Sequence, residues 1–157
     1  KMKVKITLTL FIAAVIMVSS CGTVSPTAAP SATSAEYVAG NTFGSALKSL
    51  YSQYKSQGKI VLNNQATILN LATLATSGAA IKGLGTNTSN YKNFATGVIA
   101  GSTNLINNNT VNNIISSVNN LNLSSVVNSL NNNTITPATT SSVTNSLVSI
   151  LGMMGNK

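Results

Sequence analysis

The sequence has no histidine, arginine, aspartate or tryptophan, and it contains one glutamate, Glu36, and one cysteine, Cys21. General acid–base catalysis commonly needs a histidine or a carboxylate beside the substrate. Metal sites need clustered carboxylates, imidazoles or thiolates. A chain of 157 residues with one carboxylate and one thiol cannot assemble either kind of site from these side chains. We therefore expect a protein that is not an enzyme and that holds no metal or other cofactor.

Charge is also scarce. Charged residues make up 6% of the chain and hydrophobic residues 43%, and the remaining polarity comes mainly from asparagine, serine and threonine. Disordered chains are typically highly charged and poor in aliphatic residues, so this composition favours a packed domain. The formal net charge is +8, but beyond the first five residues the lysines are scattered. Because nucleic-acid binding needs a concentrated basic patch, no nucleic-acid partner is expected.

The start of the chain carries the clearest motif. Lys1, Lys3 and Lys5 precede an apolar run of 13 residues, 6–18, and the small residues Ser19 and Ser20 follow. A basic start, a short apolar core and small residues before a cleavage point are typical of a secretory signal peptide. The run is too short for a transmembrane helix, which needs about 20 residues.

Val18-Ser19-Ser20-Cys21 resembles the lipobox of bacterial lipoproteins, in which an aliphatic residue and two small residues precede a cysteine. The resemblance implies cleavage before Cys21 and covalent lipid on its thiol. Gly22 in place of an aspartate implies onward sorting to the outer membrane of a Gram-negative cell. The membrane is then the first expected partner, through the lipid anchor, and an envelope protein is the second. The alternative is an ordinary signal peptide followed by an unrelated cysteine.

Three regions are expected in the chain. Residues 1–20 are predicted to be the signal peptide, residues 21–40 the lipidated cysteine and a flexible linker, and residues 41–157 the domain. Pro26 and Pro30, among small residues, favour an extended linker. We predict an all-α domain, a small irregular bundle of about five or six helices.

Apolar residues recur at helical spacing through the domain. We predict a helix over residues 42–57, capped by Asn41 or Thr42 and ended by Gly58, because glycine favours the position just after a helix. A second helix is expected over about 63–77. A loop with one turn is expected over 78–88, because Gly78, Gly83 and Gly85 interrupt the pattern. A third helix is predicted to begin at Ser89 or Asn90, with Leu105 and Ile106 still on its apolar face.

The last third of the chain is repetitive. Asn-Asn-Asn-Thr occurs at 107–110 and again at 131–134, and Ser-Ser-Val recurs between these runs and after them. Three short apolar stripes predict three short helices, and Thr136 before Pro137 is typical of a helix start. Asparagine-rich β-structure is the alternative, because valine, isoleucine and threonine favour strands.

One catalytic pattern does occur. Ser45-Ala46-Leu47-Lys48 matches S-x-x-K, the nucleophile motif of penicillin-binding proteins and serine β-lactamases. On a helix this spacing places the two polar side chains one turn apart, so the lysine could accept the hydroxyl proton. No K-T-G sequence follows, and serine with lysine at this spacing is frequent by chance.

A candidate interaction surface comes from aromatic and small residues. Tyr51, Tyr54 and Tyr91 are amphipathic rings of the kind that line interfaces, although at helical spacing they also suit the edge of a core. Gly97 and Gly101 form a G-x-x-x-G pattern, which allows two helices to approach closely. The alternative for these glycines is a tight helix crossing inside the bundle itself.

Together these features predict a lipid-anchored protein of the bacterial cell envelope, acting as a non-catalytic structural or protein-interaction module. The alternatives are a membrane-active amphipathic helical protein and a hydrolase that uses Ser45 and Lys48.

Overall fold

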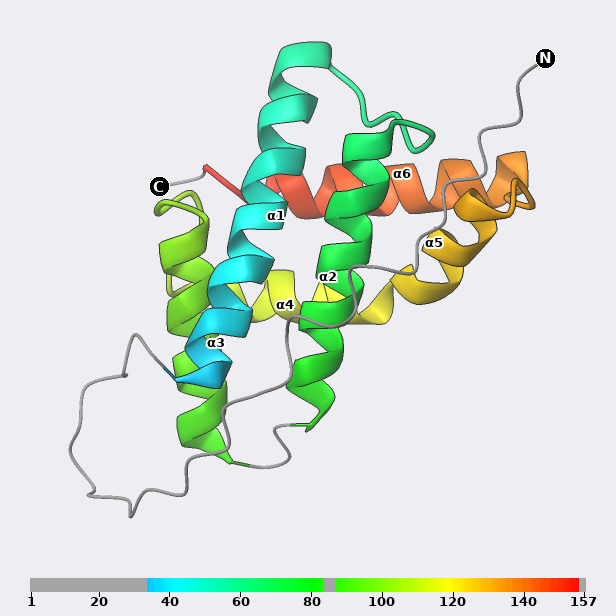
Figure 1. Ribbon diagram of the computed structural model, residues 1–157. Coiled ribbons are helices and arrows are strands. Elements are labelled where there is room, and N and C mark those ends of the chain that lie inside the picture. Colours follow the sequence, from blue (N-terminus) through cyan, green and yellow to red (C-terminus); the bar gives the residue numbers. More distant parts are fainter. Residues whose placement is uncertain (1–33, 84–86, 156–157) are drawn as a thin grey trace.

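The computed structural model of the chain describes residues 34–83 and 87–155. Within these ranges the chain forms six helices and no strand, which confirms the all-α bundle and excludes β-structure in the last third (Figure 1). The helices are α1 (Ala35–Gln57), α2 (Gln65–Gly83), α3 (Thr88–Gly101), α4 (Val111–Asn120), α5 (Leu123–Asn131) and α6 (Pro137–Gly152).

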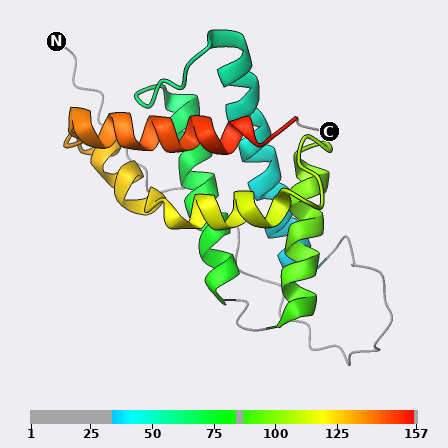
Figure 2. The same ribbon diagram turned by 180° about the vertical axis from the view of Figure 1, so that it is seen from behind.

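The helices form two layers. Helices α3, α1 and α2 lie side by side in one layer, with α1 in the middle, and α2 runs in the opposite direction to the other two (Figure 1). Helices α4 and α6 run across the back of this layer, and α5 joins them beside α2 (Figure 2). The end of the first layer at which α1 begins therefore also holds the end of α2 and the start of α3.

Glycines set the distance between α1 and α3. A Cβ atom on Gly40 would lie 2.0 Å from the carbonyl oxygen of Phe94, and one on Gly44 would lie 2.1 Å from that of Val98. From the other side, a Cβ on Gly101 would lie 2.0 Å from the carbonyl oxygen of Asn41. Only glycine fits at these positions, because the two backbones touch. Approach this close is typical of small-residue helix pairs and of Cα–H···O contacts.

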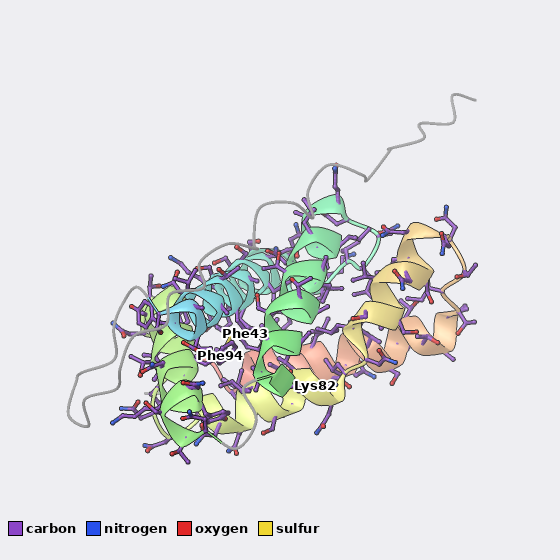
Figure 3. The ribbon with its side chains drawn as sticks, turned by 60° about the horizontal axis from the view of Figure 1, so that its bottom comes forward. Phe43, Lys82 and Phe94 are labelled. Carbon is purple, nitrogen blue, oxygen red and sulfur yellow. The ribbon has the colours of Figure 1, made fainter. Side chains whose placement is uncertain are left out.

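The core lies between the two layers. Phe43 of α1 and Phe94 of α3 are fully buried, and their rings meet edge to face with centroids 5.6 Å apart (Figure 3). All three predicted apolar stripes of the last third are buried in the same core, as expected: Val111, Ile114, Ile115, Val118, Leu123, Val126, Val127, Leu130, Val143, Leu147, Ile150 and Leu151.

Helix α1 begins seven residues before its predicted start at Thr42, so part of the predicted linker is helical. Ser34 caps the helix by accepting a hydrogen bond from the amide of Tyr37 at 3.1 Å, and Glu36 lies in the first turn, where a negative charge is favourable. The predicted end of α1 is correct: Gly58 has φ +68°, and its amide donates to the carbonyl of Tyr54.

Helix α2 continues past its predicted end at Ser77, so the predicted loop over 78–88 is wrong for 78–83 and for Thr88, which starts α3. The misleading residue is Gly78, which does not break the helix. A Cβ there would lie 2.8 Å from the Asn119 side chain and 3.9 Å from Phe43, so this glycine leaves space for the Asn119 side chain of α4.

Polar residues mark the starts of α3 and α6. Asn87 caps α3 by accepting from the amides of Ser89 and Asn90, close to the predicted start. Helix α3 ends at Gly101, earlier than predicted, so the buried Ile106 reaches the core from a loop. The predicted start at Thr136 is confirmed: its hydroxyl accepts from the amide of Thr139 at 3.2 Å.

Among the described helices, none is both long enough and apolar enough to cross a membrane.

Candidate functional site

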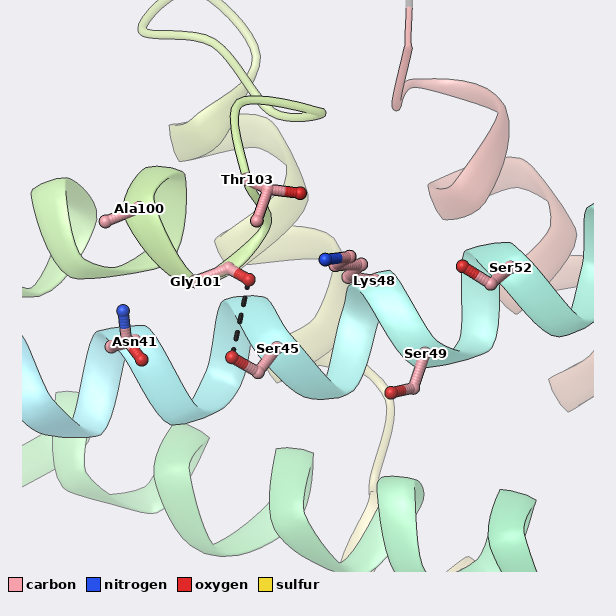
Figure 4. A pocket seen from close by; sticks show the side chains of 8 residues that line it. All are labelled: Asn41, Ser45, Lys48, Ser49, Ser52, Ala100, Gly101 and Thr103. Carbon is pink, nitrogen blue, oxygen red and sulfur yellow. Dashed lines mark hydrogen bonds between the residues drawn. The ribbon is translucent and has the colours of Figure 1, made fainter.

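A shallow polar groove marks the place where α3 ends and α1 continues beside it. Its volume is about 640 Å³ (Figure 4). The floor is one face of α1, and the wall is the last turn of α3 and the residues just after it. It is lined by Asn41, Ser45, Lys48, Ser49, Ser52, Ala100, Gly101 and Thr103. Both residues of the S-x-x-K match are therefore in this groove.

The Ser45 hydroxyl points toward α3 and not toward the amine of Lys48. It donates to the carbonyl oxygen of Gly101 at 3.3 Å, across the α1–α3 contact (Figure 4). Within the described residues, no hydrogen bond joins Ser45 to Lys48. The bond instead satisfies one of the carbonyl groups that the end of every helix leaves without an intrahelical partner.

Lys48 has a position that also fits a structural role. Its side chain extends from α1 toward Gly101 and Thr103, at the C-terminal end of α3 (Figure 4). A helix C-terminus carries a partial negative charge, and a nearby ammonium group is favourable there. The close pair α1 and α3 therefore accounts for both residues of the S-x-x-K match without a reaction.

Backbone strain lies at the rim of this groove. Thr103 has φ +53° and Asn104 has φ +62°, both in the left-handed region. Asparagine tolerates this region, but it is unusual for a β-branched residue such as threonine. The two residues reverse the chain directly after α3. A second hollow, of about 500 Å³, lies beside this turn and is lined by Ile99, Asn104, Ile106, Asn107, Asn108 and Asn109.

The three tyrosines do not form one surface. Gly40 lies against Phe94, so Tyr91 of α3 lies near the level of Tyr37. Tyr51 is 14 residues further along α1 than Tyr37, a distance of about 21 Å at 1.5 Å per residue. The predicted aromatic edge is therefore divided between two ends of the molecule.

Each tyrosine instead has local contacts. The Tyr91 hydroxyl donates to Oδ1 of Asn112 on α4 at 3.1 Å, and burial raises the pKa of this phenol above its usual value. The Lys55 ammonium group lies over the Tyr51 ring, 5.9 Å from its centroid. Tyr54 is partly buried and packs against the core. These contacts match the core-edge alternative.

The expectation that Gly97 and Gly101 offer a free interaction face is wrong. Both are buried against α1, where a Cβ on Gly97 would lie 2.2 Å from the carbonyl oxygen of Tyr37. A partner could contact Gly97 and Gly101 only if α1 moved away from α3. The alternative prediction, a tight crossing inside the bundle, is confirmed.

Sequence reasoning missed the other half of this contact. Gly40 and Gly44 form a second G-x-x-x-G pattern, on α1, that packs against the first. The signal was present in the sequence at the same four-residue spacing. Gly40 falls in the predicted linker, so the predicted helix over 42–57 contains only one of the two glycines.

Cys21 and the cleavage motif Val18, Ser19 and Ser20 lie outside the described residues. In the described part of the chain, no group of three or more histidine, cysteine, aspartate or glutamate side chains is placed to hold a metal ion. Comparison with known proteins adds no relative: no family model, no curated protein and no solved structure matches this chain.

Proposed function

We propose that this chain is a lipid-anchored lipoprotein of a bacterial cell envelope, held by Cys21, and that its helical bundle acts as a non-catalytic structural or protein-interaction module. The observation that carries the anchor is the sequence Val18-Ser19-Ser20-Cys21 directly after a short apolar run. A single acyl chain binds a membrane only marginally, and two or more give a stable anchor.

The bundle supports the non-catalytic part of the proposal through the groove between α1 and α3. Ser45 is the serine of the S-x-x-K match in this groove, and its hydroxyl donates to the carbonyl of Gly101. Lys48 lies near the C-terminal end of α3, where its positive charge is favourable.

The anchor is tested by the mass of the N-terminal peptide of the protein purified from membranes. The expected peptide begins at Cys21 and carries diacylglycerol, with or without a further acyl chain on its amino group. Cys21→Ala should remove the lipid and leave the leader attached, while Ser20→Ala, which keeps a small residue, should be processed normally. An unmodified Cys21 peptide, or normal processing of Cys21→Ala, would contradict the proposal.

The interaction role is tested by lysine-directed crosslinking in intact envelopes, followed by capture of the protein and identification of what is attached. A dominant protein partner would support an accessory subunit, and the crosslinked lysines would locate its surface. Ser45→Ala separates this role from hydrolysis: it should leave the crosslinked partner and every phenotype of the strain unchanged. Loss of a phenotype in Ser45→Ala with a normally folded protein would instead favour the hydrolase.

A further inference from the structure

The register of the first layer gathers particular residues at the end where α1 begins. Gly40 lies against Phe94 and Gly97 lies against Tyr37, so Lys92, two residues before Phe94, lies near the first turn of α1. Gly78 lies beside Phe43 and α2 runs in the opposite direction, so Lys82 also reaches the level of Val38. Figure 3 views this end and shows Lys82 at the tip of α2.

Several exposed side chains of this end suit a lipid surface. We define the anchor-proximal face as Val38, Ala79, Ala80, Lys82 and Lys92, all of which are exposed. Val38 is 51% exposed, and it is one of only two large hydrophobic side chains in the described residues with this degree of exposure. The face therefore combines apolar side chains with two ammonium groups, as surfaces that rest on headgroups do.

The charge of this end is positive even with Glu36 included. Glu36 in the first turn of α1 offsets one of the two lysines. The N-termini of α1 and α3 both lie here and each adds about half a positive charge, while the C-terminus of α2 subtracts about half. The remaining positive charge is complementary to anionic headgroups.

The chain also enters the bundle at this end. Cys21 precedes Ser34 by 13 residues, which span at most about 45 Å when extended. This step depends on the proposed lipid at Cys21: an anchor there holds the face within reach of the bilayer. A short tether turns docking into an intramolecular event at roughly millimolar effective concentration, so a weak attraction is enough.

We propose that the anchor-proximal face rests on the anionic headgroups of the membrane that holds the lipid anchor, which fixes the direction of the bundle. Lys82 and Lys92 face the headgroups. Lys55 and Lys59, at the opposite end of α1, face away from the membrane. An envelope partner would then meet that far end.

The test compares acetylation of native lysines in the protein held on vesicles. The mature protein, purified from membranes with its anchor, is inserted into vesicles of zwitterionic lipid alone or with one third anionic lipid. If Cys21 proves to carry no lipid, the same chain is coupled through this thiol, the only one in the sequence, to maleimide-bearing lipid. Failure of the lipobox prediction therefore does not prevent the docking test.

On anionic vesicles, Lys82 and Lys92 should be acetylated about threefold more slowly relative to Lys55 and Lys59 than on zwitterionic vesicles, and high salt should remove the difference. An unchanged ratio, or slower acetylation at Lys55 and Lys59 instead, would overturn the proposal.

A pair of matched variants gives a second measurement. Lys82→Gln with Lys92→Gln and Lys55→Gln with Lys59→Gln remove the same charge from opposite ends of the bundle. Anionic lipid should slow hydrogen exchange at the first turn of α1 in the parent and in the second variant, but not in the first. Equal behaviour of the two variants would show that overall charge, rather than this face, determines the contact with lipid.

Discussion

The contact between α1 and α3 predicts that replacing a glycine by alanine destabilises the protein, whereas helix propensity predicts the opposite. Replacing glycine by alanine inside a helix normally stabilises it by up to about 1 kcal/mol. At Gly44 the new Cβ would lie 2.1 Å from the carbonyl oxygen of Val98 and 2.8 Å from the amide nitrogen of Ser102. Both are backbone atoms and cannot rotate away, so the two helices would have to separate by about 1 Å.

Separation by this amount loosens the packing of Phe43 and Phe94, which are fully buried beside the contact. Overpacking of a core costs about 1–3 kcal/mol, and we use the upper value because backbone is met on two sides. After subtracting about 1 kcal/mol for the better helix former, Gly44→Ala should reduce the free energy of unfolding by about 2 kcal/mol. For a domain of this size the melting temperature should fall by about 6–10 °C.

The assay is urea and thermal unfolding followed by circular dichroism at the helical band. Gly152→Ala is the matched control, because it makes the same change in a helix and nothing lies within 4 Å of its new Cβ. It should be neutral or stabilise by up to about 1 kcal/mol. If Gly44→Ala were as stable as the parent, helix propensity alone would govern the position, and the close approach of α1 and α3 would be wrong.

Three further predictions concern individual side chains. Burial raises the pKa of the Tyr91 phenol in the folded protein above its usual value of 10.0. The stability that this neutral phenol contributes is fully present below about pH 10 and is lost as the pH rises through the folded-state pKa. Tyr91→Phe should therefore lose less stability between about pH 9 and about pH 11 than the parent does, as measured by urea unfolding at both pH values. Thr136→Ala removes the cap of α6 and should cost about 1 kcal/mol in the same assay, while Ser141→Ala on the exposed side of that helix should change stability by less than about 0.5 kcal/mol. Thr103→Gly relieves a left-handed threonine and should stabilise by about 1 kcal/mol, whereas Thr103→Val, which keeps the β-branch, should not.

The class of fold could be predicted from the sequence because its signals are local. The apolar spacing of the last third and the cap at Thr136 each act within a few residues, and both are confirmed. The end of α1 at Gly58 is of the same kind, since a left-handed glycine after a helix needs no tertiary partner.

The wrong start of α1 and the wrong end of α2 have one physical cause, which is that glycine has two opposite uses. Gly40 falls in the predicted linker and Gly78 in the predicted loop, but each lies inside a helix, Gly40 against the Phe94 backbone and Gly78 beside the Asn119 side chain. Local propensity penalises glycine in a helix by about 1 kcal/mol, and packing against a second backbone can outweigh that penalty. For Gly40, the paired pattern on another segment, Gly97 with Gly101, distinguishes the two uses.

The candidate site was found only in part for a related reason. The motif located Ser45 and Lys48 on one face of a helix, as the structure shows. It could not reveal that α3 ends beside them, which gives the hydroxyl a backbone acceptor at Gly101. The separation of Tyr91 from Tyr51 likewise depends on the offset between two helices, which no local pattern contains.

That offset links stability with orientation in this protein. With one carboxylate in the sequence, networks of ion pairs cannot hold the helices in register. The glycine contacts do so instead, because each fits against one backbone carbonyl of the opposite helix. A slip of α3 by one turn would move Lys92 by about 5.4 Å relative to Val38 and divide the anchor-proximal face. The residues that allow α1 and α3 to touch therefore also place the lysines that we propose meet the membrane.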